Sequence, residues 1–167
     1  SALGATLRER RHDFARECPQ QVRRDAEVHQ QHVFDAERVQ MLQAPDEYYD
    51  GYSWYDLAPN QLPGILRSRE KLEEVFTELV RAGFQTEKVF LFGFSQGCLM
   101  TLEFGARYPH SLAGCIGISG YCYDPKALIA EASIEGKNGD WLITHGTQDD
   151  VLPVETTEAQ MHELIAA

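Results

Sequence analysis

A serine lies between two glycines at a spacing that suits nucleophilic catalysis. In Gly93-Phe94-Ser95-Gln96-Gly97 the serine stands two residues from a glycine on either side. An apolar run precedes the motif and helical spacing follows it, which predicts a very tight strand-to-helix turn where larger side chains at the glycines would collide. Such a turn projects the Ser95 hydroxyl for attack on an acyl carbon, and the backbone N–H of Gln96 falls where an oxyanion forms. An ordinary glycine-rich turn is the alternative interpretation.

Two acidic residues follow a later apolar run. Residues 141–144 are apolar, and the loop after them carries Asp149 and Asp150. Because the carboxyl ends of parallel strands meet at one edge of a sheet, an acid in this loop can orient a histidine toward Ser95. The chain order would be serine, aspartate, histidine. The loop alone leaves both aspartates open as the acid.

The elements that position these residues alternate between apolar runs and helical periodicity. This order predicts an α/β fold with right-handed crossovers and a mostly parallel sheet that has helices on both faces. The nearly unbroken apolar run 88–94 is typical of a strand buried on both faces. Residues 46–60 contain five aromatic residues and predict a long ordered loop with aromatic anchors. The predicted strands are 38–43, 88–94, 112–119 and 141–144, and the predicted helices are 63–82, 99–108, 125–132 and 154–166.

The composition is that of a globular protein with an acidic surface. A chain of 167 residues with 43% hydrophobic content is expected to form a single domain, with an atypical polar helical segment at 1–37 and a recognisable core at 38–167. The net charge of −11 disfavours nucleic acid and anionic lipid as partners. No stretch has the length of apolar sequence that stable membrane insertion needs, and no signal-peptide pattern opens the chain, so a cytoplasmic location is expected.

Cysteines and histidines show no metal-binding pattern. The four cysteines are Cys18, Cys98, Cys115 and Cys122. Without CxxC pairs they are expected to be buried or idle thiols, among which Cys122, set among aromatic residues, is the most notable. His29 and His32 stand three residues apart but lack a third ligand, so no metal and no organic cofactor are expected.

Three segments together resemble the carboxylesterase/phospholipase family of α/β-hydrolases, which includes the acyl-protein thioesterases. They are Ala44-Pro45 with Ser53-Trp54-Tyr55-Asp56, the motif around Ser95, and His145-Gly146-Thr147-Gln148-Asp149 with Val151 and Pro153. The resemblance implies an α/β-hydrolase fold that cleaves small carboxylic esters or thioesters through an acyl-serine intermediate. It implies Ser95 as nucleophile, Gln96 as an oxyanion donor and Asp149 rather than Asp150 as the triad acid. Leu3, in Leu3-Gly4-Ala5, matches the end of the loop that supplies the second oxyanion donor.

The resemblance does not identify the triad histidine. In the family it follows the acid after one helix and one further strand, and this sequence stops near the end of that helix, so the chain is expected to be incomplete at both ends. His145 matches a structural His-Gly turn, His162 lies on the last predicted helix, and His110 follows a proline in a loop. The remaining histidines, His12 and the pair at positions 29 and 32, fall in the polar segment.

Two functional hypotheses therefore stay open. The first is a serine hydrolase with a histidine supplied from elsewhere, and the second is a non-catalytic derivative that binds a ligand or partner. A dienelactone-type hydrolase is disfavoured because the turn holds Ser95 and not cysteine. A sheet that lacks its last strand would have an unpaired edge, which favours a homodimer.

Overall fold

The computed structural model describes residues 33–34 and 37–167, and the chain divides into two compact units, Ser1–Leu42 and Gln43–Ala167. In the first unit β1 (Val33–Phe34) pairs antiparallel with β2 (Glu37–Arg38). The strand predicted at 38–43 is wrong beyond its first residue, because residues 39–45 form no strand. Val39 and Met41 are 54% and 82% exposed, so their alternation with polar residues reflects no buried face.

A three-stranded parallel sheet forms the centre of the second unit. Its order is β5 (Phe90–Phe94), β6 (Gly114–Ile118) and β7 (Trp141–Thr144). The three strands predicted at 88–94, 112–119 and 141–144, and their parallel arrangement, are thus confirmed. The last residues of the three strands, Phe94, Ile118 and Thr144, are in register with one another. The segments that follow the strands therefore start at one common edge of the sheet.

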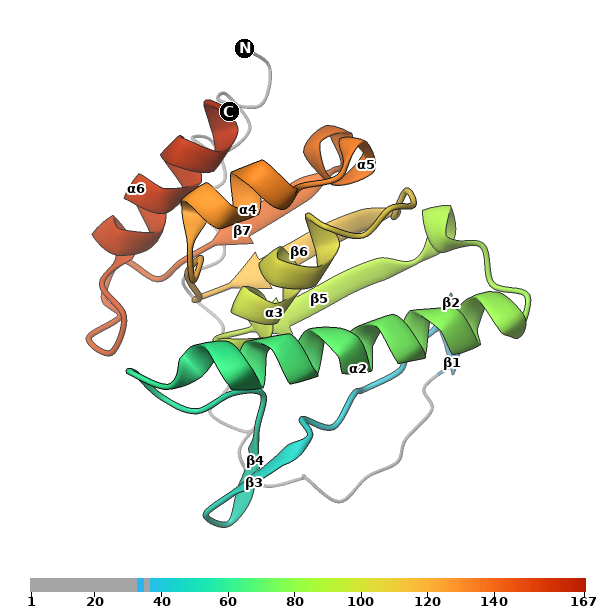
Figure 1. Ribbon diagram of the computed structural model, residues 1–167, viewed down its shortest axis with the longest axis horizontal. Coiled ribbons are helices and arrows are strands. Elements are labelled where there is room, and N and C mark those ends of the chain that lie inside the picture. Colours follow the sequence, from blue (N-terminus) through green and yellow to red (C-terminus); the bar gives the residue numbers. More distant parts are fainter. Residues whose placement is uncertain (1–32, 35–36) are drawn as a thin grey trace. The chain divides into compact units, whose positions relative to one another are not determined.

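Helices connect and flank these strands (Figure 1). Between β5 and β6 runs α3 (Gln96–Gly105), and between β6 and β7 run α4 (Pro125–Glu131) and α5 (Ile134–Asn138). The sequence prediction missed α5, which has only five residues and no buried one, so it has no apolar periodicity to detect.

The two longest helices agree with their predictions within two residues. They are α2 (Gln61–Arg81) and α6 (Val154–Ile165). Helix α2 buries one stripe at helical spacing, formed by Gly64, Ile65, Ser68, Leu72 and Phe76. A short 3-10 turn, η3 (Thr86–Lys88), leads from α2 into β5. None of the described helices combines sufficient length with sufficient hydropathy to act as a membrane span.

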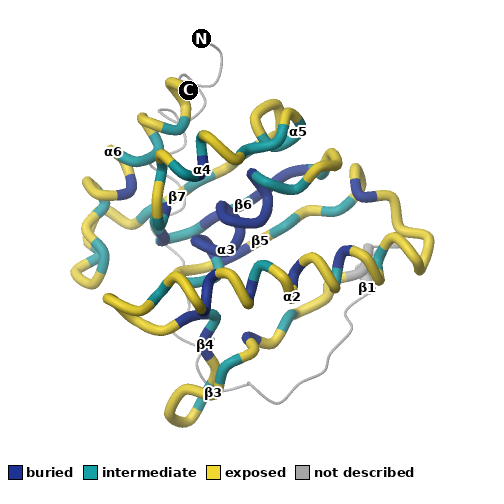
Figure 2. Tube along the Cα trace, viewed as in Figure 1, coloured by how far each residue is buried: buried dark blue, intermediate teal, exposed yellow. Residues whose placement is uncertain are grey.

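One face of the sheet packs closely against α3, which is buried along its length (Figure 2). Glycines permit the short distance between the two layers. A Cβ atom on Gly117 of β6 would lie 2.6 Å from Cys98 Sγ, and one on Gly105 of α3 would lie 2.8 Å from Cys115 Sγ. The core cluster next to this contact comprises Cys98, Leu102, Ala106, Cys122 and Leu128.

The opposite face of β5 is exposed, so the prediction that this strand is buried on both faces is wrong. Successive side chains of a strand point to opposite faces. Gly93 faces α3, whereas Phe90, Phe92 and Phe94 point away and are 60–65% exposed. The described part of the chain therefore covers only one face of β5.

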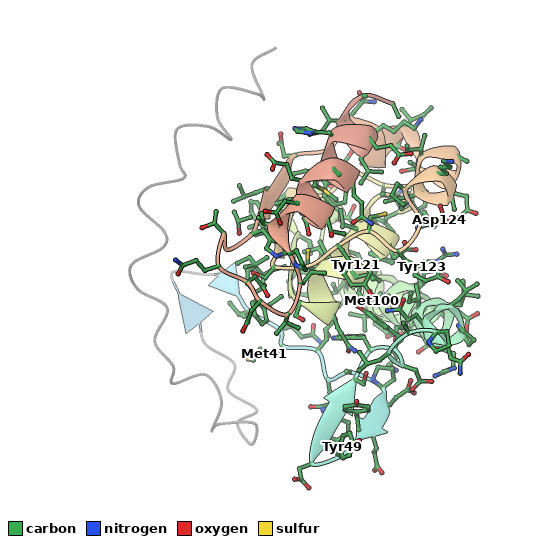
Figure 3. The ribbon with its side chains drawn as sticks, turned by 90° about the vertical axis from the view of Figure 1, so that its left-hand side faces the viewer. Met41, Tyr49, Met100, Tyr121, Tyr123 and Asp124 are labelled. Carbon is green, nitrogen blue, oxygen red and sulfur yellow. The ribbon has the colours of Figure 1, made fainter. Side chains whose placement is uncertain are left out.

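The predicted aromatic loop at 46–60 contains a β-hairpin of β3 (Asp46–Tyr48) and β4 (Gly51–Ser53). The hairpin extends away from the helices and ends at Tyr49, which is 92% exposed (Figure 3). The prediction that its aromatic residues act as anchors holds for Tyr55, which is 2% exposed, but not for the exposed Tyr48, Tyr49 and Tyr52. Tyr55 packs closely on Gly64 of α2, where a Cβ would lie 2.7 Å from the Tyr55 Cα.

Candidate active site

Ser95 occupies a strained turn between β5 and α3. Its backbone has φ 54° and ψ −115°, a conformation that costs a non-glycine residue about 1–3 kcal/mol. Neighbouring bonds hold it in place: the Ser95 N–H donates to Ile118 O (2.8 Å), and Ser95 O accepts from the Cys98 N–H (3.0 Å). The side chain makes no capping bond to α3, and the residue is exposed. The fold thus presents the hydroxyl to solvent at the carboxyl edge of the sheet.

The two glycines of the motif have different roles. A Cβ on Gly93 would lie 2.0 Å from Gly97 O and 2.6 Å from Thr101 Oγ1, so the turn requires glycine there. A Cβ on Gly97 would meet no atom within 4 Å. The expectation that both glycines avoid a collision is therefore right for Gly93 and wrong for Gly97, because the Cα–Cβ direction at Gly97 points into open space.

The residue after Ser95 contributes through both its backbone and its side chain. Gln96 is the first residue of α3, and the first N–H groups of a helix have no intrahelical partner. The positive end of the helix dipole adds to the attraction of an anion at this point. The Gln96 side chain, whose role the sequence did not indicate, bonds to the segment after β4. Its Oε1 accepts from the Trp54 N–H (2.9 Å), and its Nε2 donates to Tyr55 O (3.0 Å).

Asp149 lies in the loop that follows β7. Its Oδ1 accepts hydrogen bonds from the N–H groups of Leu152 (2.9 Å) and Val151 (3.1 Å). The bond from Leu152, helped by the one from Val151 and by nearby His145, holds the pKa of Asp149 below its usual value despite an opposing effect of partial burial. The carboxylate is therefore ionised at neutral pH. Asp150, the competing candidate, is exposed.

Ser95 and Asp149 follow the two outer strands of the described sheet. Neighbouring strands are about 4.8 Å apart, so the ends of β5 and β7 are separated by about 10 Å. Both residues come after carboxyl ends that lie in register. The structure thus brings the nucleophile candidate and the acid candidate to the same edge of the sheet, on either side of the segment that follows β6.

No described histidine hydrogen-bonds to Ser95. His145 is almost fully buried, and its Nε2 lies 2.8 Å from Leu152 O and 3.4 Å from Asp149 Oδ2. Its Nδ1 is buried without a partner. His145 thus joins the two ends of the acid loop, which agrees with a structural role. His110 stacks edge-on against Tyr108 ahead of β6, at the other edge of the sheet, and His162 is exposed on α6.

The loop after β6 lies between the serine turn and the acid loop, because β6 is the middle strand. Figure 3 labels two of its residues, Tyr121 and Tyr123. Helix α6 holds this loop through side chains: the buried Thr157 hydroxyl donates to Gly120 O (2.6 Å). Gln160 accepts from the Cys122 N–H and donates to Cys122 O, both at 2.9 Å. The sequence did not indicate these contacts, which span more than 35 residues.

The described cysteines are buried and protonated. Burial raises the pKa of the Cys98 thiol to about 11 and the pKa values of Cys115 and Cys122 to about 12. Cys122, which the sequence set apart by its aromatic neighbours, is therefore a buried thiol like the other two. Five other residues considered in the sequence, Leu3, Cys18, His12, His29 and His32, lie outside the described residues.

Comparison with known proteins places this geometry in a family. The model of the phospholipase/carboxylesterase family matches residues 29–167. Acyl-protein thioesterase 1 of Schizosaccharomyces pombe is 33% identical over 118 residues, which are 71% of this chain and 53% of that protein. A probable carboxylesterase of Oryza sativa subsp. japonica is 29% identical over 115 residues, 64% of this chain and 43% of that protein. The chain spans about half the length of the curated relatives it matches.

Solved structures agree with this assignment. SOBER1 from Arabidopsis thaliana superposes with a TM-score of 0.63 at 26% identity, covering 71% of this chain and 61% of that one. Esterase PE8 gives a TM-score of 0.59 at 32% identity, covering 74% of this chain and 61% of that one. The α/β-hydrolase fold expected from the sequence is confirmed. With the family match over most of its length, the chain belongs to the phospholipase/carboxylesterase family of α/β-hydrolases.

Proposed function

We propose that this protein is a serine hydrolase that cleaves small carboxylic esters or thioesters through an acyl-serine intermediate. The observation that carries the proposal is the strained, exposed Ser95 at the start of α3, with its hydroxyl free of any capping bond. Relatives named acyl-protein thioesterase and probable carboxylesterase support the substrate class. The net charge of −11 favours neutral or cationic substrates over anionic ones.

In the proposed reaction the Ser95 Oγ attacks the carbonyl carbon of the substrate, and its proton passes to a histidine. The carbonyl oxygen becomes an oxyanion, which accepts a hydrogen bond from the Gln96 N–H. The bond to the alcohol or thiol then breaks as the histidine returns the proton to the leaving group. Water repeats these steps on the acyl-serine and releases the carboxylic acid. Leu3 is the candidate for a second N–H donor on the basis of the resemblance alone.

Asp149 is the proposed orienting acid. Its carboxylate is held in the ionised form, which suits a group that stabilises a charged imidazole. The histidine itself is proposed to come from outside the described residues. Ser95 and Asp149 both follow strand ends at the same edge of the sheet, which supports a histidine that bonds to both side chains there. Without that base the Ser95 hydroxyl stays protonated, and the rate falls by several powers of ten.

Replacing the nucleophile tests the proposal. In the full-length protein, Ser95→Ala is expected to abolish hydrolysis of p-nitrophenyl acetate and covalent labelling by a fluorophosphonate probe. Ser111→Ala is the matched control, because Ser111 is an exposed serine ahead of β6, at the edge of the sheet away from Ser95. Equal hydrolysis by the wild-type protein and Ser95→Ala would refute the proposal.

The same labelling experiment separates the competing function, a ligand-binding derivative without catalysis. That function rests on the observation that no described histidine bonds to Ser95. A wild-type protein that binds a fatty acid or ester ligand but is never labelled at Ser95 would favour it. Labelling at Ser95 would exclude it.

The remaining proposals concern location and assembly. We propose a cytoplasmic location, which rests on the sequence pattern alone, and no binding of nucleic acid, because a net charge of −11 repels phosphate groups. A homodimer is proposed because β5 is an edge strand of the described sheet and its phenylalanines are exposed. Sedimentation velocity would report a single monomeric species if the homodimer is wrong.

A further inference from the structure

The Gln96 side chain makes its hydrogen bonds to a segment that is more than 40 residues away in the sequence. Its amide uses both polar ends: Oε1 accepts from the Trp54 N–H, and Nε2 donates to Tyr55 O. The Ser53 hydroxyl, 2.7 Å from Tyr55 O, also lies 3.1 Å from Gln96 Oε1. A carboxylate at position 96 would lack the donor, and an apolar side chain would lack both groups.

The segment that Gln96 contacts is itself held firmly. The Tyr55 ring is buried, and its backbone lies against Gly64 of α2. The Ser68 hydroxyl donates to Trp54 O from the next turn of the same helix. Gln61, the first residue of the same helix, donates a hydrogen bond to the Tyr121 hydroxyl on the loop after β6. Gln96 is therefore attached to a rigid part of the protein and not to a free loop.

The hydrogen bonds of the Gln96 side chain restrict the peptide group whose N–H takes part in the proposed reaction. Gln96 immediately follows Ser95, and its own N–H is the proposed oxyanion donor. Hydrogen bonds weaken steeply as the donor tilts away from its acceptor. A side chain fixed at both ends of its amide restricts rotation of the peptide that carries this N–H. The Ser95 carbonyl, which belongs to the same peptide, also accepts hydrogen bonds from the N–H groups of Cys98 (3.0 Å) and Leu99 (3.3 Å). The side-chain amide of Gln96 therefore adds a second restraint, on the side of the Ser53–Tyr55 segment, to the one that α3 provides.

We propose that the Gln96 side chain is a positioning residue, which fixes the oxyanion donor by bonding the serine turn to the Ser53–Tyr55 segment. This inference rests on the proposed function. It assigns to the side chain a role in the transition state and none in binding of the ground-state substrate. Removal of the side-chain amide is therefore expected to lower kcat and to leave KM nearly unchanged.

The first test compares Gln96→Met with the wild-type full-length protein. Methionine has a similar length and no amide, while the backbone N–H remains. We expect kcat for p-nitrophenyl acetate to fall about tenfold with KM within about twofold, less than the 10²–10³-fold effect of losing an oxyanion donor completely. Gln85→Met is the matched control, because Gln85 is exposed and makes no side-chain capping bond at η3.

Hydrogen exchange provides a readout that does not depend on turnover. The Trp54 N–H is expected to exchange about tenfold faster in Gln96→Met than in the wild-type protein, because it loses its acceptor. Unchanged exchange of Trp54, or an unchanged kcat in a folded Gln96→Met protein, would overturn the inference. A fall in kcat/KM that comes entirely from KM would also overturn it.

A second variant keeps the inference testable if Gln96→Met does not fold. Gln96→Glu retains an acceptor for the Trp54 N–H but places a carboxylate oxygen against Tyr55 O. Protonation restores a donor at that position, so the kcat of the variant relative to wild type should rise as the pH falls toward 5. A ratio that is constant with pH would count against the inference. Failure of the proposed function is distinguished by Ser95→Ala, which would then retain the wild-type rate.

Discussion

Alanine at Gly93 is predicted to disrupt the serine turn, whereas the same change at Gly97 is predicted to leave it intact. A Cβ on Gly93 would lie 2.0 Å and 2.2 Å from the carbonyl oxygen and carbon of Gly97, and 2.6 Å from Thr101 Oγ1. The two nearest atoms belong to the backbone in the first turn of α3 and cannot rotate away. The methyl group must therefore push β5 and α3 apart at the residue that carries the hydroxyl.

The magnitude follows from two contributions. Inserting a methyl group into a packed site costs about 1–3 kcal/mol, and a backbone clash belongs at the upper end of that range. Shifting α3 also weakens the bond from the Thr101 hydroxyl to Gly97 O, which is 2.9 Å long and contributes about 1 kcal/mol. Together these give a loss of about 3–4 kcal/mol, or a fall in Tm of about 6–16 °C for a protein of this size.

Thermal unfolding followed by circular dichroism measures the effect, and fluorophosphonate labelling of Ser95 reports on the turn. Gly97→Ala is the matched control, because its Cβ would meet no atom within 4 Å. Replacing glycine by alanine within a helix stabilises by up to about 1 kcal/mol, so its Tm should stay level or rise. Equal Tm shifts for the two variants would refute the geometric reasoning, as would a Gly93→Ala protein with wild-type Tm and labelling rate.

Two further predictions concern the loops beside Ser95. Thr157→Val leaves the Gly120 carbonyl without its donor and should lower the free energy of unfolding, measured by chemical denaturation, by about 1–3 kcal/mol. Thr156→Val, at an exposed position, is the control and should change it by less than about 0.5 kcal/mol. Equal effects of the two variants would contradict the conclusion that α6 holds the loop after β6. The folded-state pKa of Asp149 is lowered, so its charge contributes stability above the ordinary carboxyl value of 3.8 that is lost as the pH falls through the folded value. Asp149→Asn should therefore be destabilised at pH 7 and converge with the wild type in acid, and a difference that is independent of pH would exclude this linkage.

Local patterns in the sequence were sufficient for the order of the three central strands and the longer helices, and for the serine motif. Helix α2 and strand β7 were predicted from the spacing of their apolar residues, a pattern that can be read from residues at most a few positions apart. The glycine at position 93 was correctly linked to the tight turn because its clash partner, Gly97, is also close in the sequence. Asp149 remained a prediction supported by the resemblance, and the structure shows its backbone hydrogen bonds.

Contacts between distant residues were decided by the tertiary structure alone. Nothing in the local sequence distinguishes the covered side of β5 from its exposed phenylalanines, because both sides are apolar and only the position of α3 separates them. The bonds from Gln96 to the Trp54 and Tyr55 backbone, and from Thr157 to Gly120, join residues that are 37 to 42 positions apart. Glutamine and threonine residues are mostly exposed in folded proteins, so the residue type alone does not reveal that these two side chains have distant partners. The sequence alone therefore singled out Ser95 as the candidate nucleophile, whereas the packing of the elements determined what holds that residue in place.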